Sequence, residues 1–336
     1  VYVRFDLDLF LFQIHKVLWE TKLFDLNLFN LNWDAPKVQP VLANLESDGT
    51  LRLNVGGRAG NRGYFNTSDG GEVVTLHGSG GTVGVEFDGW YQTFSGVRRV
   101  VGDMGAGNDV LDATRLRDVA VEVNGGGGDD VLSGGDGGGS LWGDVGDDVL
   151  RAGRFDAGSV ADGVYRNGTF QAGVGVGRRW VMDGGDGADQ LTGGGGNDEL
   201  WGGSGDDKLQ GGAGIDLLRG GAGADQLEGQ AGDDVLWGDD GDDRLKGGDG
   251  RDTYAYANDD GNDTIDDKSG DSVLDLSAMT TGAEVSLSSR GASLLQNGQE
   301  SRASAARVSE VRLGSGSDVL RISEVPDWTV TVHDSG

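Results

Sequence analysis

The sequence predicts an all-β solenoid in which one short turn and one short strand repeat along the chain. The first observation is a block of eight nonapeptides in unbroken register over residues 184–255. The second is that Gly keeps position four, Asp keeps position six, and Leu or Tyr keeps position eight in every copy. The third is that apolar and polar residues alternate outside this block, which is typical of strands. A fixed period with its residue types in phase indicates a solenoid with one supersecondary unit per repeat.

Each part of the nonapeptide has a physical role. The first six positions alternate Gly with acidic residues, which suits a tight turn with left-handed dihedral angles. The last three positions, x-Leu-x, predict a short strand with one side chain inward and two outward. Turn and strand make half a coil, so two nonapeptides close one coil, and strands of successive coils stack about 4.8 Å apart.

Loops that are 18 residues apart then lie directly above one another and gather the position-six aspartates into two columns. One column holds Asp189, Asp207, Asp225 and Asp243, and the opposite column holds Asp198, Asp216, Asp234 and Asp252. Carboxylates this close together repel strongly unless a cation lies between them. Only oxygen ligands are available, from Asp side chains and flexible turn carbonyls, and this combination favours Ca²⁺ over Zn²⁺ or Mg²⁺.

The pattern GGxGxDxUx closely resembles the RTX, or haemolysin-type, calcium-binding repeat. The resemblance implies a right-handed parallel β-roll in which turn carbonyls and the position-six Asp hold each calcium ion between stacked loops. A flexible Gly-rich linker is the alternative, and eight copies in constant phase argue against it. The carbonyl ligands implied here belong to positions one and three, namely Gly184, Asp186, Gly193, Gly195, Gly202, Ser204, Gly211, Ala213, Gly220, Ala222, Gly229, Ala231, Gly238 and Asp240.

The composition points to the same cofactor. The chain of 336 residues contains 65 Gly and no Cys, and its formal net charge is −29. Nucleic acid and anionic membrane surfaces are therefore unfavourable partners, and disulfides do not stabilise the fold. Roughly ten bound Ca²⁺ would offset about 20 negative charges, so we expect the module to be largely unfolded without calcium and folded with it. Extracellular modules bind calcium with dissociation constants of roughly 10⁻⁴–10⁻³ M, which predicts folding outside the cell.

Residues 1–40 alternate apolar and polar side chains and predict paired strands followed by a Pro-containing linker. The aromatic residues of this segment fit either a core or a docking face. The first residues, VYVRFDLDLF, carry charges throughout and no initiator Met, so we expect a piece of a longer chain and no secretion signal. No stretch of about 18 uncharged apolar residues occurs, so no membrane span is expected.

Residues 41–124 predict a β-rich module with strands at 50–55, 72–76, 83–87 and 97–101. It ends in a lone degenerate repeat, whose Asp109 is a candidate calcium ligand. The predicted β-roll occupies residues 125–275 and begins with three nonapeptides. In these, Asp130 and Asp148 are expected to share an ion, whereas Gly139 replaces Asp and predicts a weak or empty site.

Residues 152–183 break the nine-residue register and predict an insertion in the roll, either a contact site for a partner or a packed flap. Val174, Val176, Trp180 and Met182 indicate a strand or hairpin within it. After residue 255 the register shifts by two residues, which makes Asp263 a further candidate ligand.

Residues 276–336 predict a β-rich segment that is a truncated second copy of the 82–127 region. Residues 314–336 align without gaps on residues 105–127 at an offset of 209, with Asp318 on Asp109. This duplication predicts that the module recurs and that further repeats follow it in the native protein.

The sequence contains no recognisable catalytic constellation, and we expect no enzymatic activity from this chain. Its three His residues are isolated, and no zinc, P-loop, Rossmann or G-x-S-x-G motif occurs. Trp142, Trp201 and Trp237 take position nine and are expected to point outward, where a surface glycan or a protein would find a contact site.

The sequence as a whole predicts a calcium-binding structural or adhesive module of a secreted or cell-surface bacterial repeat protein. The RTX resemblance implies export by type I secretion. The alternative is a calcium-binding appendage of a secreted enzyme, such as a protease, lipase or epimerase, or of a toxin, whose active domain lies outside this sequence.

Overall fold

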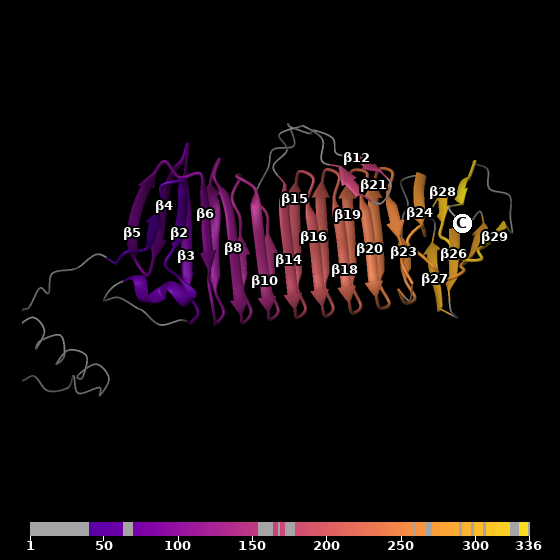
Figure 1. Ribbon diagram of the computed structural model, residues 1–336, viewed down its shortest axis with the longest axis horizontal. Coiled ribbons are helices and arrows are strands. Elements are labelled where there is room, and N and C mark those ends of the chain that lie inside the picture. The colour runs from indigo at the N-terminus through magenta and orange to yellow at the C-terminus, as the bar shows by residue number, and fades with distance from the viewer. Residues whose placement is uncertain are drawn as a thin grey trace, which may run out of the picture. The chain divides into compact units, whose positions relative to one another are not determined.

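The computed structural model describes residues 40–62, 70–153, 164–166, 169–171, 179–258, 260–266, 271–288, 291–296, 299–304, 307–322 and 329–334. The chain divides into two compact units, Val1–Gln39 and Pro40–Gly336. The paired strands predicted in the first unit lie outside the described residues. Within the second unit, strands stand side by side along a long axis and form an elongated solenoid (Figure 1).

Strands account for almost all regular structure in the described part of the second unit. The segment before the roll contains β1 (Ala43–Leu45), β2 (Thr50–Leu53), the 3₁₀ helix η1 (Gly56–Arg62), β3 (Val73–Ser79), β4 (Thr82–Phe87), β5 (Trp90–Ser95), β6 (Arg99–Asp103), β7 (Val110–Leu116) and β8 (Ala120–Gly127). The first part of the roll contains β9 (Val131–Ser133), β10 (Gly139–Val145) and β11 (Val149–Arg151). The insertion contributes β12 (Val164–Arg166) and β13 (Thr169–Gln171), which pair as an antiparallel hairpin.

The second part of the roll follows the nonapeptide rhythm. Its strands are β14 (Trp180–Asp186), β15 (Gln190–Gly195), β16 (Glu199–Ser204), β17 (Lys208–Ala213), β18 (Leu217–Ala222), β19 (Gln226–Ala231), β20 (Val235–Asp240), β21 (Arg244–Asp249), β22 (Thr253–Ala255), β23 (Thr264–Asp266) and β24 (Asp271–Asp275). The final segment contains β25 (Glu284–Ser288), β26 (Gly291–Gln296), β27 (Gln299–Ser304), β28 (Arg307–Leu313), β29 (Val319–Ile322) and β30 (Thr331–Asp334).

Two long sheets form the walls of the solenoid. In the described residues, sheet A has the order β1-β2-β6-β8-β10-β14-β16-β18-β20-β22-β24-β28-β30, and sheet B has the order β29-β25-β26-β27-β23-β21-β19-β17-β15-β11-β9-β7-β3-β4-β5. Consecutive roll strands alternate between the sheets, and roll strands that neighbour each other within a sheet run parallel. The prediction of an all-β parallel roll is confirmed.

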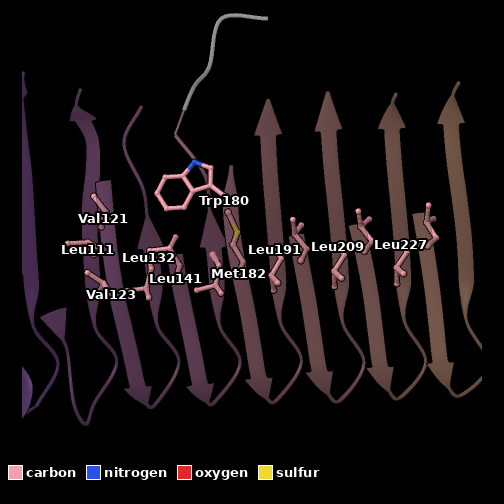
Figure 2. Packing of buried hydrophobic residues seen from close by; sticks show 14 of the residues in the cluster. Leu111, Val121, Val123, Leu132, Leu141, Trp180, Met182, Leu191, Leu209 and Leu227 are labelled. Carbon is pink, nitrogen blue, oxygen red and sulfur yellow. The ribbon is translucent and has the colours of Figure 1, made fainter. Parts of the chain in front are cut away.

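The coil of 18 residues is visible in the strand register. Leu200 pairs with Leu218 in sheet A, and Leu209 pairs with Leu227 in sheet B. The position-eight side chains point between the sheets and form the continuous core, as Figure 2 shows for several of them. Each is at most 2% exposed: Leu132, Leu141, Leu150, Leu191, Leu200, Leu209, Leu218, Leu227, Leu236, Leu245 and Tyr254.

The strands are longer than the sequence predicts. Each full roll strand continues through position three of the following nonapeptide, so that Gly203 pairs with Gly221 and Ser204 pairs with Ala222. The glycines of positions one and two therefore belong to the strands, and the turn is reduced to positions four to six. The prediction of a six-residue turn is wrong because Gly is compatible with extended pairing as well as with turns.

Position four requires Gly for two physical reasons. Gly205 has a φ of +128°, a region that L-residues with a side chain rarely adopt. A Cβ at Gly205 would also lie only 1.9 Å from the carbonyl oxygen of Gly187 in the preceding coil. The close stacking of the loops thus depends on this position.

The segments on either side of the roll continue both sheets. Across residue 124, β7 pairs with β9 and β8 pairs with β10, while beyond residue 275 β24 pairs with β28. Four of the predicted strands correspond to β2, β3, β4 and β6, whereas β1 and β5 were not predicted. The predicted boundaries at residues 124 and 276 therefore do not coincide with breaks in strand pairing.

The insertion leaves the roll after Gly153 and returns at Trp180. Trp180 and Met182, which the sequence analysis assigned to the insertion, lie in β14 and are fully buried. Met182 pairs with Leu141 and takes the inward place of position eight, and Trp180 pairs with Gly139 and takes the place of position six. These residues keep the inward and outward alternation of a roll strand but lack the Gly and Asp of the motif. The motif therefore did not reveal the strand, and the assignment to the insertion was wrong. Val174 and Val176 lie outside the described residues.

Candidate metal centre

The predicted aspartates form two columns along the solenoid. In the first column, the backbone N–H of one Asp donates to Oδ1 of the Asp in the next coil. Asp189 donates in this way to Asp207, and Asp207 donates to Asp225, each at 2.8 Å. The column consists of Asp109, Asp130, Asp148, Asp189, Asp207, Asp225, Asp243 and Asp263. The step from Asp243 to Asp263 spans 20 residues, as the two-residue offset in the sequence predicts.

The second column lies on the opposite side of each coil and uses the same bond. It consists of Asp198, Asp216, Asp234 and Asp252. Its first member, Asp198, accepts the N–H of Trp180 at 2.8 Å. The aspartates of both columns are at most 2% exposed. All twelve predicted aspartates therefore lie in the two columns, and their role as ligands stays a prediction.

One oxygen of these carboxylates is bonded and the other is not. While Oδ1 accepts a backbone N–H, Oδ2 is buried and has no hydrogen-bond partner in nine residues, namely Asp130, Asp148, Asp189, Asp198, Asp207, Asp216, Asp225, Asp234 and Asp243. A buried carboxylate oxygen without a partner is energetically costly. The repetition of this feature from coil to coil indicates a common unsatisfied acceptor site.

The position-one glycines border this site. A Cβ at Gly202 would lie 2.3 Å from Oδ2 of Asp207 and 2.5 Å from the carbonyl oxygen of Gly220 in the next coil. The equivalent distances at Gly184 are 2.2 Å to Oδ2 of Asp189 and 2.5 Å to the carbonyl oxygen of Gly202. A carboxylate oxygen and a carbonyl oxygen therefore converge beside each of these glycines, in a space that a side chain would fill. Such a hard-oxygen donor set fits Ca²⁺.

The chain matches the family model of the RTX calcium-binding nonapeptide repeat over residues 124–156, 183–218 and 219–254. The chain contains RTX calcium-binding repeats. The matched ranges cover both repeat blocks and leave out most of the insertion. The resemblance identified from the GGxGxD pattern is thereby confirmed, and repeats of this family bind calcium and are structural rather than catalytic. A search of curated proteins found no match.

The position-three carbonyls of the RTX roll have a partner in the structure. The N–H of Gly187 donates to the carbonyl of Ser204, and the N–H of Gly205 donates to the carbonyl of Ala222, at 2.8 and 2.7 Å. A carbonyl oxygen has a second lone pair, so these hydrogen bonds do not prevent the position-three carbonyls from binding calcium. Calcium ligation at position three stays a prediction. No group of three or more acidic or histidine side chains that could hold a metal occurs in the described part of the chain. Any site in the roll therefore needs backbone oxygens.

Burial strongly favours the protonated form of these carboxylates when no cation is bound. It raises the pKa of Asp198, Asp216 and Asp234 to about 8. In the first column, burial raises the pKa of Asp189 and Asp207 to about 7, and the neighbouring carboxylates contribute in the same direction. A bound divalent cation would offset both effects by stabilising the ionised form.

The opposite column of the RTX roll ends at Trp180. At a regular position-one glycine, such as Gly125, a Cβ would meet Oδ2 of the Asp in the same repeat. At Gly134, whose repeat carries Gly139 in place of Asp, a Cβ would instead lie 2.0 Å from the indole ring of Trp180. This ring is buried in the core (Figure 2). The site that the sequence predicts to be weak or empty is thus occupied by an aromatic side chain.

The sequence reasoning missed some acidic residues with protected carboxylates, among them the buried Asp260 and the half-buried Asp318. Asp260 accepts the N–H of Ala257, and burial raises its pKa to about 6. Asp318 accepts the N–H of Ala283 at 2.8 Å, and its Oδ2 is buried without a hydrogen-bond partner. The alignment of Asp318 on Asp109 contained the signal that would have identified the second residue. No helix in the described ranges is long and apolar enough to cross a membrane.

Proposed function

We propose that this protein is a calcium-locked structural module of a secreted or cell-surface bacterial repeat protein. Calcium binding along the two aspartate columns would convert a weakly folded, acidic chain into a rigid rod. The observation that carries this proposal is the series of nine buried Asp Oδ2 atoms without hydrogen-bond partners, which recurs from coil to coil along the described roll. Each is one coil from the next, so a row of cations would satisfy the whole series.

The residues that would hold calcium are the position-six aspartates and the position-one carbonyls of stacked loops. Each bound ion supplies two positive charges in a place where buried carboxylates accumulate. With the aspartates of both columns engaged, roughly ten ions would be bound. The neutralised loops could then stack closely, and the hydrogen bonds between coils would hold the core in register.

The dependence of folding on calcium also favours folding outside the cell. A chain that needs calcium near the extracellular concentration would stay largely unfolded in the cytosol, where free calcium is much lower. An unfolded chain is also the form that a type I secretion channel would pass. RTX repeats occur in secreted bacterial proteins, which is consistent with this order of events.

An adhesive role is supported by the outward face of sheet A. Asp183 pairs with Trp201, Trp201 with Arg219, and Arg219 with Trp237, so aromatic and charged side chains alternate along this face. Trp201 is 42% exposed and borders a shallow hollow with Asp183 and Arg219. This hollow would suit a surface glycan or a protein. Binding of the calcium-loaded protein to a glycan array should fall on Trp201→Ala; equal binding by both proteins would argue against this contact site.

Circular dichroism with and without millimolar Ca²⁺ tests the structural proposal. We expect the β-sheet signal to appear on addition of calcium and to disappear with a chelator, while Mg²⁺ at the same concentration leaves the spectrum unchanged. A spectrum that shows full β-structure without calcium at neutral pH would contradict the coupling of folding to metal.

A further inference from the structure

The segments before and after the roll share one architecture, and we call them the first flank (residues 73–127) and the second flank (residues 284–334). In each, three strands form an antiparallel meander, β3-β4-β5 in the first and β25-β26-β27 in the second. In each, the first meander strand also pairs in parallel with a later strand, β7 or β29. In sheet A the register agrees as well, because Gly102 pairs with Val123 and Val311 pairs with Val332, both shifted by 209 residues. In sheet B, the pairing of β25 with β29 is shifted by two residues relative to that of β3 with β7.

The first flank shows what covers this architecture. The strands β7 and β8 are covered by the first coil of the roll, in which Leu132 pairs with Leu111 and Leu141 pairs with Val123. Under this coil, Leu111, Val121 and Val123 are all 0% exposed. The first flank therefore ends in β7 and β8, and the outer edges of these two strands pair in parallel with β9 and β10 of the roll.

The second flank presents the same two strands at the ends of the sheets. β29 is the last strand of sheet B and β30 is the last strand of sheet A in the described residues. Val332, the counterpart of the fully buried Val123, is 42% exposed, and Leu320, the counterpart of the fully buried Leu111, is only half-buried. The outer edge of a terminal strand presents unpaired backbone N–H and C=O groups to which a further strand can pair, and exposed apolar side chains there favour such pairing.

An aspartate precedes the equivalent strand in each flank, Asp109 before β7 and Asp318 before β29. In the first flank the N–H of Glu72 donates to Oδ1 of Asp109 at 2.6 Å, and the N–H of Asp109 donates to Asp130 of the covering coil at 2.7 Å. In the second flank the N–H of Ala283 donates to Oδ1 of Asp318 at 2.8 Å. Oδ2 of Asp318 is buried without a hydrogen-bond partner, like Oδ2 of the aspartates within the roll.

We propose that β29 and β30 are an acceptor surface for the first coil of another RTX roll, a second copy of the coil that follows Asn124. The new strands pair in parallel with β29 and β30 and bury Leu320 and Val332, as the first coil of the roll buries Leu111 and Val123. Asp318 then becomes a ligand of the calcium ion between the last loop of the second flank and the first loop of the added roll. This metal part rests on the proposed function, whereas the strand pairing stands on the duplicated architecture alone.

A tandem chain tests this inference, with residues 1–336 followed directly by a second copy of residues 128–336. Since Gly336 aligns with Gly127, the added roll begins in phase. Hydrogen exchange in calcium should show slower exchange of β29 and β30 in the tandem than in the single chain, by about tenfold or more. Asp318→Asn should lower the number of bound calcium ions by about one in the tandem and leave the single chain unchanged.

The matched control is the same tandem with a Gly-Ser pair inserted after Gly336, which keeps the tether and breaks the register. We expect β29 and β30 to exchange in this control as in the single chain. If both rolls of the in-phase tandem bind calcium and exchange of β29 and β30 stays at the single-chain rate, the acceptor surface is refuted. If neither roll binds calcium, the proposed function fails and the role of Asp318 fails with it, while slowed exchange would still support the strand pairing.

Discussion

At the scale of single residues, the position-six aspartate combines two roles on its two oxygens. Oδ1 of Asp207 accepts the N–H of Asp189 and joins neighbouring coils, whereas its Oδ2 has no hydrogen-bond partner. Asn can keep the first role through its side-chain oxygen and loses the second, because its other atom is an NH₂ donor. Substitution by Asn therefore separates the stacking bond from cation binding.

Asp207→Asn combined with Asp225→Asn should raise the calcium concentration at the folding midpoint roughly tenfold or more, because both residues lie in the middle of a column. Asp263→Asn should have a smaller effect, since Asp263 lies at the irregular end of the column. Calcium titrations followed by circular dichroism measure both. Asp206→Asn, an exposed change in the same loop, is the control for lost charge. Equal and negligible effects of the buried substitutions would refute the stacked columns.

The pH dependence of folding follows from the raised pKa values of the columns. Without calcium, Asp198, Asp216 and Asp234 hold protons up to about pH 8 in the fold, whereas the unfolded chain releases them near its ordinary pKa of 3.8. The metal-free fold is thus most stable below about pH 4 and loses this stability as the pH rises toward 8. We expect more metal-free β-structure at pH 5 than at pH 8.

Calcium must displace these protons from any metal-free chain that is already folded, and this folded population is larger at low pH, so the midpoint concentration for calcium binding should be lower at pH 8 than at pH 6. Calcium titrations at the two pH values measure this difference. A midpoint that rises with pH would contradict the assignment of the buried carboxylates as the cation ligands.

At the scale of the repeat, the turn geometry depends on which glycine is replaced. In the first nonapeptide, Gly128 at position four has a φ of +122°, and a Cβ there would lie 2.5 Å from the carbonyl oxygen of Gly107. Its neighbour Gly127 at position three has open space around its would-be Cβ. This difference explains why position three varies among Gly, Asp, Ser, Ala and Val while position four is always Gly.

Gly128→Ala should destabilise the calcium-loaded protein by more than about 1 kcal/mol because of both strain and steric overlap. The adjacent Gly127→Ala should change stability by no more than about 0.5 kcal/mol. Urea unfolding in saturating calcium measures the two variants. Similar losses in both would show that neither φ nor loop stacking limits position four.

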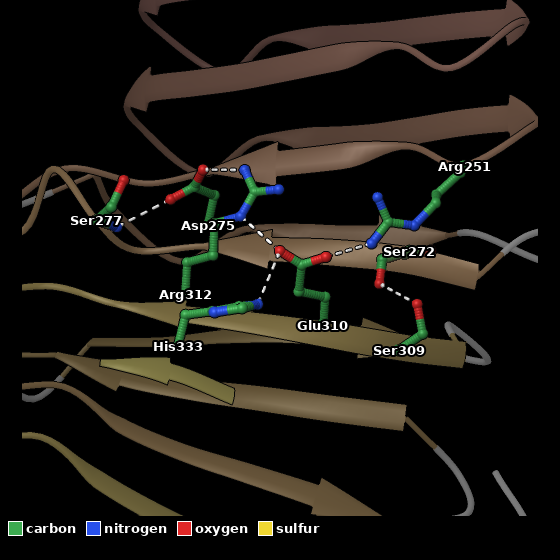
Figure 3. A network of polar contacts seen from close by, with 8 residues as sticks. All are labelled: Arg251, Ser272, Asp275, Ser277, Ser309, Glu310, Arg312 and His333. Carbon is green, nitrogen blue, oxygen red and sulfur yellow. Dashed lines mark hydrogen bonds and ion pairs between the residues drawn. The ribbon is translucent and has the colours of Figure 1, made fainter. Parts of the chain in front are cut away.

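At the scale of the whole molecule, a network of charges joins the roll to the second flank (Figure 3). Arg312 donates to Asp275 of β24 at 2.9 Å and to Glu310 of its own strand at 2.7 Å. Arg251, in the last nonapeptide, also donates to Glu310. Although burial opposes the shift, the hydrogen bonds from the two arginines lower the pKa of Glu310. The network therefore holds its charge over the physiological range and links three neighbouring coils.

Glu310→Gln should lower the stability of this joint by about 1–3 kcal/mol, because it removes the charge that two arginines share in a largely buried place. The control is Glu284→Gln, which removes a more exposed pair with Arg321 and should cost less than about 1 kcal/mol. Urea unfolding in calcium and hydrogen exchange of β28 measure both variants. An equal response to the two substitutions would argue against a structural role for the network.

Much of the roll could be predicted from the sequence because a solenoid makes each repeat depend mainly on its neighbours. The inward Leu209, the stacked Asp207 and the shifted Asp263 all follow from counting residues along one period. The place of Trp180 could not be predicted in this way, because its fit depends on the space that Gly134 and Gly139 leave in a different coil. The unpredicted strand β5 shows the same limit, since it is fixed by a hairpin partner and not by the period.

The sequence by itself determined the coil length, the inward and outward faces of the strands and the two aspartate columns. These features are local or repeat at a fixed interval, so residue spacing alone specifies them. Only the tertiary structure decided that the flanks continue both sheets, that an indole ring closes the second column, and that β29 and β30 present the surface that a roll covers on β7 and β8. Those outcomes depend on which strands meet across long sequence distances and on the volume left between them.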